Sequence, residues 1–216
     1  MPKVSAVFFD LDGTLRDSLD AVYGSLQHAV EVHTGKRPTR DDIRPHVHHH
    51  VAVHKALASN VPEDDFVQTF RDKLYPTQDD ITLYDTAHET VRALHEKGYI
   101  LAVVTSASHE NSVDFVRKWA LDEYFDAISG VTDTVHPKPA PDLILNALAL
   151  TGCAPDETIM IGDLPADVAC AHAAGVRCIG ITHGFGLRDT LEAAGADYIV
   201  DTLTEIPALI EQIEAE

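Results

Sequence analysis

The stretch VSAVFFDLDGT, residues 4–14, decides the fold and carries the first two candidate catalytic residues. Its apolar half, VSAVFF (4–9), has the length and composition of a strand that is buried on both faces. Its polar half places carboxylates at Asp10 and Asp12. In an open parallel sheet, ligands bind beyond the carboxyl ends of the strands. Both aspartates are therefore expected where chemistry takes place, although a D-x-D pair taken alone also fits an ordinary surface turn.

Outward from this stretch, short apolar runs alternate with helical patterns. We expect further strands at 99–104, 158–161, 177–181 and 198–200, and helices at 85–98, 108–121 and 141–152. Strands that alternate with helices imply βαβ units and a parallel sheet. The sequence therefore predicts an α/β fold with a three-layer Rossmann-like core.

The alternation is interrupted at residues 16–80. This segment reads as three successive helical stretches, 17–35, 39–58 and 62–75, and no second strand is expected before residue 99. The simplest interpretation is a small α-helical cap domain inserted after the first strand, with residues 1–15 and 81–216 forming the core.

The charge balance excludes two classes of partner. The 35 acidic residues against 16 Lys and Arg give a formal net charge of −19, which repels nucleic acid and anionic membranes.

Three cysteines (Cys153, Cys170 and Cys178) without C-x-x-C spacing indicate a reducing compartment. The N-terminal apolar run is too short for a signal peptide, and no run has the length of a membrane span. We expect a cytoplasmic protein, monomeric or homodimeric.

Polar residues follow the second strand and a later loop. Thr105 and Ser106 end the second strand, where hydroxyls and backbone N–H groups could bind an oxyanion. Capping of the next helix by Ser106 or Ser108 is the alternative, and it is favoured when these residues are read alone. Lys138 stands between prolines in HPKPAPD (136–142), which could hold it as a positioned cation; an ordinary solvated lysine is the alternative.

The third strand end adds two more carboxylates. Asp163 ends TIMIGD and Asp167 follows four residues later, so the two either face one another across a helical turn or serve as a cap and a solvated residue. Four carboxylates in one crevice would repel one another unless a cation lay between them. Oxygen ligands favour Mg²⁺, and an aspartate can attack phosphorus. Together these residues predict Mg²⁺-assisted phosphoryl chemistry on a small phosphorylated metabolite.

The motifs DLDGT (10–14), Thr105, KPxPD (138–142) and GDxxxD (162–167) occur in this order at strand ends. In this pattern the sequence resembles the haloacid dehalogenase-like hydrolase superfamily. The helical insert resembles the phosphoglycolate phosphatase-like subgroup, which carries a small α-helical cap.

The resemblance implies a role for each matching residue. Asp10 would attack phosphorus to form an aspartyl-phosphate, and Asp12 would protonate the leaving oxygen and then activate water. Thr105 and Lys138 would bind the phosphoryl oxygens, with Ser106 beside them. Mg²⁺ would be held by the Asp10 carboxylate, the Asp12 backbone carbonyl and Asp163. Asp167 would be a further ligand or would orient one of these ligands.

Two departures from the family pattern concern the substrate. Ser106 stands where asparagine is common, and HVHHH (46–50) replaces a glycine-rich stretch of the cap. The acid at Asp12 favours phosphatases over dehalogenases, which lack it. A phosphosugar mutase on the same core is an alternative enzyme.

The histidine tract RPHVHHHVAVH (44–54) suggests a third reading, a His-rich metal-binding or regulatory module. A continuous helix would place His46, His50 and His54 on one face. The insert position instead favours histidines in the cap, where His46, His48, His49, His50 or His54 could approach the substrate phosphate.

Overall fold

The computed structural model describes residues 3–134 and 136–215 and divides into two compact units. Unit 1 comprises Met1–Arg16 and Leu83–Glu216, and unit 2 comprises Asp17–Thr82. The sequence pattern places the insert at 16–80.

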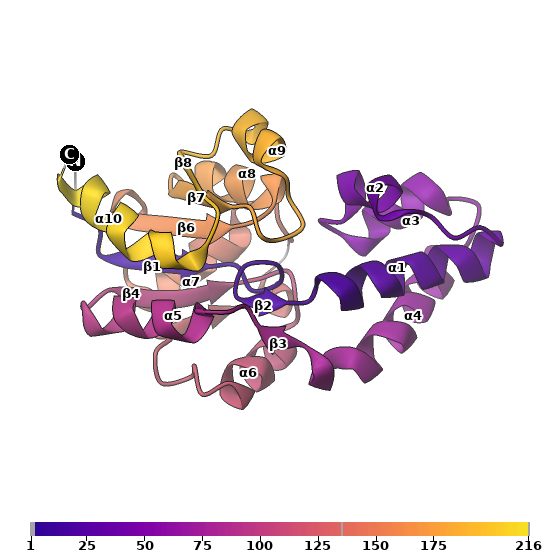
Figure 1. Cartoon of the computed structure of the whole chain (residues 1–216), viewed down its shortest axis with the longest axis horizontal. Coiled ribbons are helices and arrows are strands. Elements are labelled where there is room, and N and C mark those ends of the chain that lie inside the picture. The colour runs from indigo at the N-terminus through magenta and orange to yellow at the C-terminus, as the bar shows by residue number, and fades with distance from the viewer. Residues whose placement is uncertain (1–2, 135, 216) are drawn as a thin grey trace. The chain divides into compact units, whose positions relative to one another are not determined.

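Unit 1 is built on a six-stranded sheet in the order β5-β4-β1-β6-β7-β8 (Figure 1). All five strand pairings are parallel, which confirms the predicted sheet. Because β1 lies between β4 and β6, the carboxyl ends of these three strands meet at one edge. The strands are β1 (Ala6–Phe9), β4 (Ile100–Val104), β5 (Ala127–Ser129), β6 (Thr158–Gly162), β7 (Arg177–Ile181) and β8 (Tyr198–Val200).

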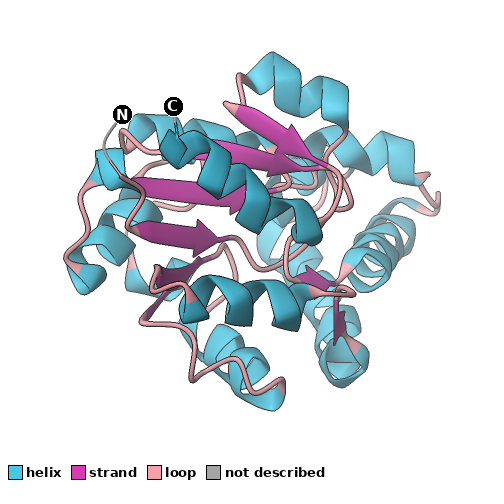
Figure 2. Cartoon of the chain, turned by 60° about the vertical axis from the view of Figure 1, so that its left-hand side comes forward, coloured by secondary structure: helices cyan, strands magenta, loops and turns pink. Residues whose placement is uncertain are grey.

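Helices cover both faces of this sheet, as Figure 2 shows, so the predicted three-layer architecture is confirmed. On one face, Phe8 and Met160 pack in a core cluster with Leu143 and Val168 from two helices. Residues that alternate with these along the strands, such as Phe9, point to the other face and are also fully buried. The helices are α5 (Ala87–Glu96), α6 (His109–Lys118), α7 (Asp142–Thr151), α8 (Pro165–Ala173), α9 (Arg188–Ala194) and α10 (Ile206–Ala215), with short 3₁₀ turns η3 (Val131–Asp133), η4 (Pro155–Glu157) and η5 (Leu203–Glu205).

Unit 2 is helical. Helix α4 packs against both α1 and α3, and Leu26, Val53 and Phe66 are buried in its small core. Within the described ranges, no helix of the chain is both long enough and apolar enough to cross a membrane. The elements are α1 (Leu19–Thr34), α2 (Arg40–Ile43), η1 (Arg44–His46), α3 (His50–Leu57), α4 (Glu63–Leu74) and η2 (Tyr75–Asp80).

The single helix expected at 39–58 is wrong. Pro45 has no N–H for a continuing helix, so α2 gives way to the 3₁₀ turn η1. His49 is extended and caps α3, its Nδ1 accepting the Val51 N–H at 3.3 Å. His46 therefore does not share a helix face with His50 and His54.

The absence of strands before residue 99 is also wrong. Strands β2 (Arg16–Asp17) and β3 (Thr82–Leu83) pair in a separate two-stranded sheet, at the points where the chain passes from one unit to the other. Two-residue strands are too short to leave a period in the sequence.

Candidate active site

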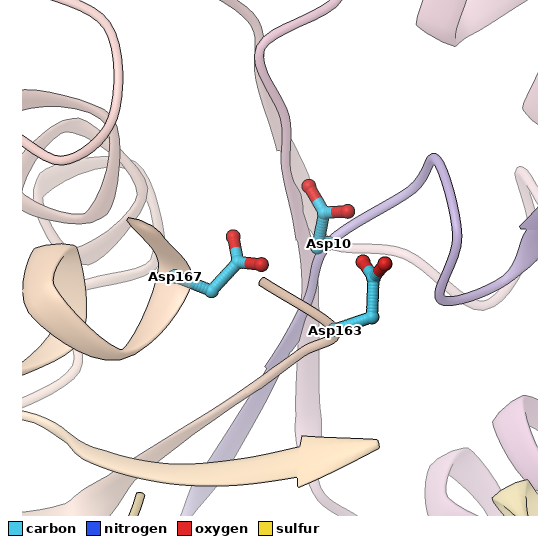
Figure 3. A group of neighbouring side chains, drawn as sticks. All are labelled: Asp10, Asp163 and Asp167. Atoms are coloured by element: carbon cyan, nitrogen blue, oxygen red, sulfur yellow. The ribbon is translucent and has the colours of Figure 1, made fainter. Parts of the chain in front are cut away.

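Three aspartates converge at the carboxyl edge of the sheet (Figure 3). Asp10 follows β1, Asp163 follows β6, and Asp167 lies in the first turn of α8. One ligand atom of each carboxylate lies within 4.8 Å of the others. The three residues are buried, with Asp163 fully so. They form the group of three potential metal ligands that the described part of the chain provides.

Lys138 binds this group directly. Its Nζ donates to Asp10 Oδ1 and Asp167 Oδ1, each at 2.6 Å, and to the Val104 carbonyl at 2.7 Å. The residue is only 6% exposed, so the alternative of a solvated surface lysine is wrong. A buried ammonium therefore bridges two of the three carboxylates, those of Asp10 and Asp167.

Burial and the neighbouring charges shift the pKa values of these side chains. Burial raises the pKa of Asp10 to about 7; Lys138 opposes this rise and Asp167 adds to it. Burial, Asp10 and Asp167 likewise raise the pKa of Asp163, against the Phe185 N–H and Lys138. Burial disfavours the ammonium of Lys138, but Asp10 and Asp167 outweigh it and raise its pKa.

These shifts test whether a metal ion suits the residues. One ammonium cannot neutralise three buried carboxylates, and burial, with the neighbouring negative charges adding to it, favours protons on Asp10 and Asp163. A divalent cation would remove that surplus, and an all-oxygen donor set suits Mg²⁺. The residues present therefore fit a magnesium ion.

Asp163 is held by a loop that the sequence reading missed. Its Oδ2 accepts the Phe185 N–H at 2.6 Å, and its Oδ1 accepts from Thr14 Oγ1 at 3.3 Å. A methyl group at Gly184 would overlap Asp163 Oδ2, and one at Gly186 would overlap the Asp163 carbonyl oxygen. The two glycines shortly after the predicted strand 177–181 were the available signal, since glycine permits such close approach.

Asp167 has two functions that its sequence position left open. Its Oδ2 accepts the Leu164 N–H at 2.9 Å, which caps α8, while Oδ1 binds Lys138. It is 2% exposed, so the solvated reading is wrong. The N-cap residue is Leu164, and the carboxylate that caps the helix is that of Asp167 rather than that of Asp163, which lies before the helix among the potential ligands.

The hydroxyl pair divides between two environments. Thr105 is 1% exposed and its Oγ1 accepts the Ala107 N–H at 3.1 Å. Ser106 is half-buried in the same turn. The cap of α6 is Ser108, which accepts the Asn111 N–H, so a capping role for Ser106 is wrong. Thr105 directly follows Val104, whose carbonyl accepts a hydrogen bond from Lys138.

Asp12 stands outside the group of three. Its two oxygens accept from Arg16, Oδ1 from Nε at 2.7 Å and Oδ2 from Nη2 at 2.6 Å. It is half-buried, whereas Asp10 is buried. Two aspartates two positions apart thus have different partners, Lys138 for one and Arg16 for the other.

The histidines of unit 2 pack with one another and with aromatic rings. His49 and His50 stack at 4.4 Å, His50 stacks on Phe70 at 5.4 Å, and buried His54 contacts the Val61 carbonyl at 2.8 Å. Burial, with the nearby His49, lowers the pKa of His50 to about 4. Over the described residues, the tract supplies no group of three ligands for a metal ion.

Comparisons with known proteins agree with this geometry. The model of the haloacid dehalogenase-like hydrolase family matches residues 7–181. Pyrophosphatase PpaX of Bacillus mycoides is 28% identical over 214 residues, which cover 98% of this chain and 99% of that protein. A crystal structure of a predicted phosphatase from Clostridium acetobutylicum has a TM-score of 0.82 and 26% identity, covering 99% of this chain and 100% of that one.

A second solved structure, a predicted phosphoglycolate phosphatase from Haemophilus somnus, has a TM-score of 0.81 and 25% identity and covers 97% of this chain and 99% of that one. The likeness therefore extends over both units. The chain belongs to the haloacid dehalogenase-like hydrolase family.

Proposed function

We propose that this protein is a Mg²⁺-dependent phosphatase that hydrolyses a small phosphomonoester through an aspartyl-phosphate. The observation that carries the proposal is the buried carboxylate of Asp10, bound to Lys138 and grouped with Asp163 and Asp167. The phosphatase names of related proteins support it.

The residues divide the reaction between them. Asp10 forms a bond to phosphorus as the bond to the leaving oxygen breaks, and Asp12 supplies that oxygen with a proton. Asp12 then takes a proton from the water that attacks phosphorus, which releases phosphate and restores the Asp10 carboxylate. Lys138 and the Thr105 hydroxyl bind the phosphoryl oxygens, with Ser106 at the rim.

Charge explains the need for a metal ion. A phosphomonoester dianion would enter a site whose carboxylates outnumber its single lysine, and Asp10, Asp163 and Asp167 would hold the ion that offsets this repulsion. When bound, Mg²⁺ supplies positive charge to the phosphoryl oxygens. Such neutralisation carries much of the catalysis, because the transition state for phosphoryl transfer is loose.

Inorganic pyrophosphate is a second candidate substrate, because the relative from Bacillus mycoides is named a pyrophosphatase. The same attack by Asp10 would then expel phosphate rather than an alkoxide, and phosphate is the better leaving group. A panel of phosphorylated metabolites and pyrophosphate, assayed with Mg²⁺, separates the two. Incubation with glucose 1-phosphate tests for an isomer, the product of a phosphosugar mutase.

The decisive variant is Asp10→Asn, with 4-nitrophenyl phosphate as the substrate. We expect phosphate release to fall to background, because the amide cannot form the acyl phosphate. The matched control is Asp122→Asn, an exposed aspartate, which should keep wild-type activity. Persistent phosphate release by Asp10→Asn would show that the nucleophile is a different residue.

A further inference from the structure

Arg16 binds the carboxylate of Asp12 with a two-point grip. Nε and Nη2 each donate to a different oxygen, at 2.7 and 2.6 Å, so the guanidinium and the carboxylate face one another edge to edge. This fork fixes both the position and the plane of a carboxylate, which a lysine cannot do.

Arg16 is itself held in place. Its side chain is 6% exposed, against 27% for Asp12, and its guanidinium lies 5.0 Å from the centroid of the Phe115 ring. The turn between the two residues is closed by the Arg16 N–H to the Leu11 carbonyl at 2.8 Å and by the Gly13 N–H to the Arg16 carbonyl at 2.9 Å. The ion pair therefore belongs to a closed turn that directly follows Asp10.

A proton donor acts only within hydrogen-bond reach of the leaving oxygen. An unrestrained aspartate would sample several rotamers and spend part of its time out of reach. The fork uses one lone pair on each oxygen of Asp12 and leaves the others open for a leaving group or a water molecule. Its effect is thus to orient Asp12 without blocking it.

We propose that Arg16 is the positioning residue for the acid–base carboxylate of Asp12. The proposal rests on the proposed phosphatase function, in which Asp12 transfers protons. Arg16 acts through Asp12 and contributes most where proton transfer to the leaving group is most needed. Arg16 lies outside the family motifs, so its role follows from its contact with Asp12.

The test compares leaving groups in an Arg16→Met variant. Nitrophenolate leaves without much help from a proton, whereas an alkoxide requires one. We expect turnover of ethyl phosphate to fall about 10- to 100-fold, within the usual range for acid–base catalysis. Turnover of 4-nitrophenyl phosphate should fall far less. Arg16→Lys keeps the charge without the fork and should show the same dependence on the leaving group, which covers the case in which Arg16→Met does not fold.

A double-mutant cycle with Asp12→Asn shows whether Arg16 acts through Asp12. We expect Arg16→Met to cost little further ethyl phosphatase activity once Asp12 is an amide. The control is Arg188→Met, which removes an arginine paired with Asp201 and should leave the ratio of the two substrates unchanged. Equal losses on both substrates, additive losses in the cycle, or a gain with ethyl phosphate would each overturn the proposal. Those outcomes leave the Asp10→Asn result intact, so failure of this inference is distinct from failure of the proposed function.

Discussion

The aspartates of unit 1 and the histidines of unit 2 show opposite relations between spacing in the sequence and clustering in space. Asp10 is far in the chain from Asp163 and Asp167, yet the three converge because the adjacent parallel strands β1 and β6 deliver their carboxyl ends to one edge. The histidines are crowded in sequence, but Pro45 and the extended His49 break the helix that would have aligned them. Topology therefore predicts a site more reliably than local density of ligand residues.

The largest effect is expected from Lys138→Met. The variant leaves three buried carboxylates without their ammonium. Removing one partner of a buried ion pair costs about 3–5 kcal/mol, so we expect a large loss of stability without Mg²⁺ and loss of phosphatase activity. Denaturant unfolding with and without Mg²⁺ measures the first effect, and phosphate release measures the second.

The control is Lys97→Met, which removes an exposed lysine paired with Glu211. Its stability should change by about 0.5 kcal/mol or less. If the two variants were equally stable, the convergence of charge in unit 1 would have no energetic consequence, and its contrast with unit 2 would weaken.

The second prediction concerns Mg²⁺ and pH. Burial raises the pKa of Asp10 from 3.8 to about 7, so its contribution to the stability of the metal-free protein is present below its unfolded pKa and lost as pH rises through about 7. Mg²⁺ competes with this proton. We therefore expect the rise in Tm on adding Mg²⁺ to be larger at about pH 8 than at about pH 5.

At 100 times its Kd, Mg²⁺ should stabilise the protein by about 2.7 kcal/mol, or roughly 5–10 °C in Tm for a chain of this size. Asp163→Ala should remove most of that rise, because it deletes one of the three carboxylates. A Tm that did not respond to saturating Mg²⁺ would contradict the metal assignment.

The contrast also explains how far the sequence predicted the molecule. Short apolar runs rich in β-branched residues predicted β1, β4, β6, β7 and β8. Strand β5 was missed because its three residues, AIS, leave no distinctive pattern. The candidate residues at strand ends were identifiable in advance, since parallel topology fixes where those ends meet.

The hydrogen-bond partners of the candidate residues were harder to predict from the sequence. The grip of Arg16 on Asp12 depends on how one turn closes, and the Phe185 N–H to Asp163 joins loops from two strand ends. Neither contact follows from residue spacing. The glycines around Phe185 were the visible trace, and their meaning depended on knowing what lay against them.

A smaller effect is expected from Gly184→Ala, which tests the loop that holds Asp163. The added methyl would overlap Asp163 Oδ2 and displace a potential metal ligand. Disturbing the residues that orient a metal ligand typically costs about 10- to 100-fold in metal affinity, and we expect a loss in that range by Mg²⁺ titration. Gly24→Ala is the control, because nothing lies within 4 Å of the added methyl and affinity should not change.

The smallest effect is expected from replacing histidines of the tract. His48→Ala with His50→Ala should leave Zn²⁺ binding in equilibrium dialysis unchanged, because the described histidines do not form a group of three ligands. Burial lowers the pKa of both residues, so they are neutral near neutral pH and add no positive charge to attract an anion. Asp163→Ala is the positive control, since it should weaken Zn²⁺ bound at the carboxylates. Micromolar Zn²⁺ binding that disappeared in the histidine variant but survived Asp163→Ala would reverse the comparison, and unit 2 would then hold a metal site of its own.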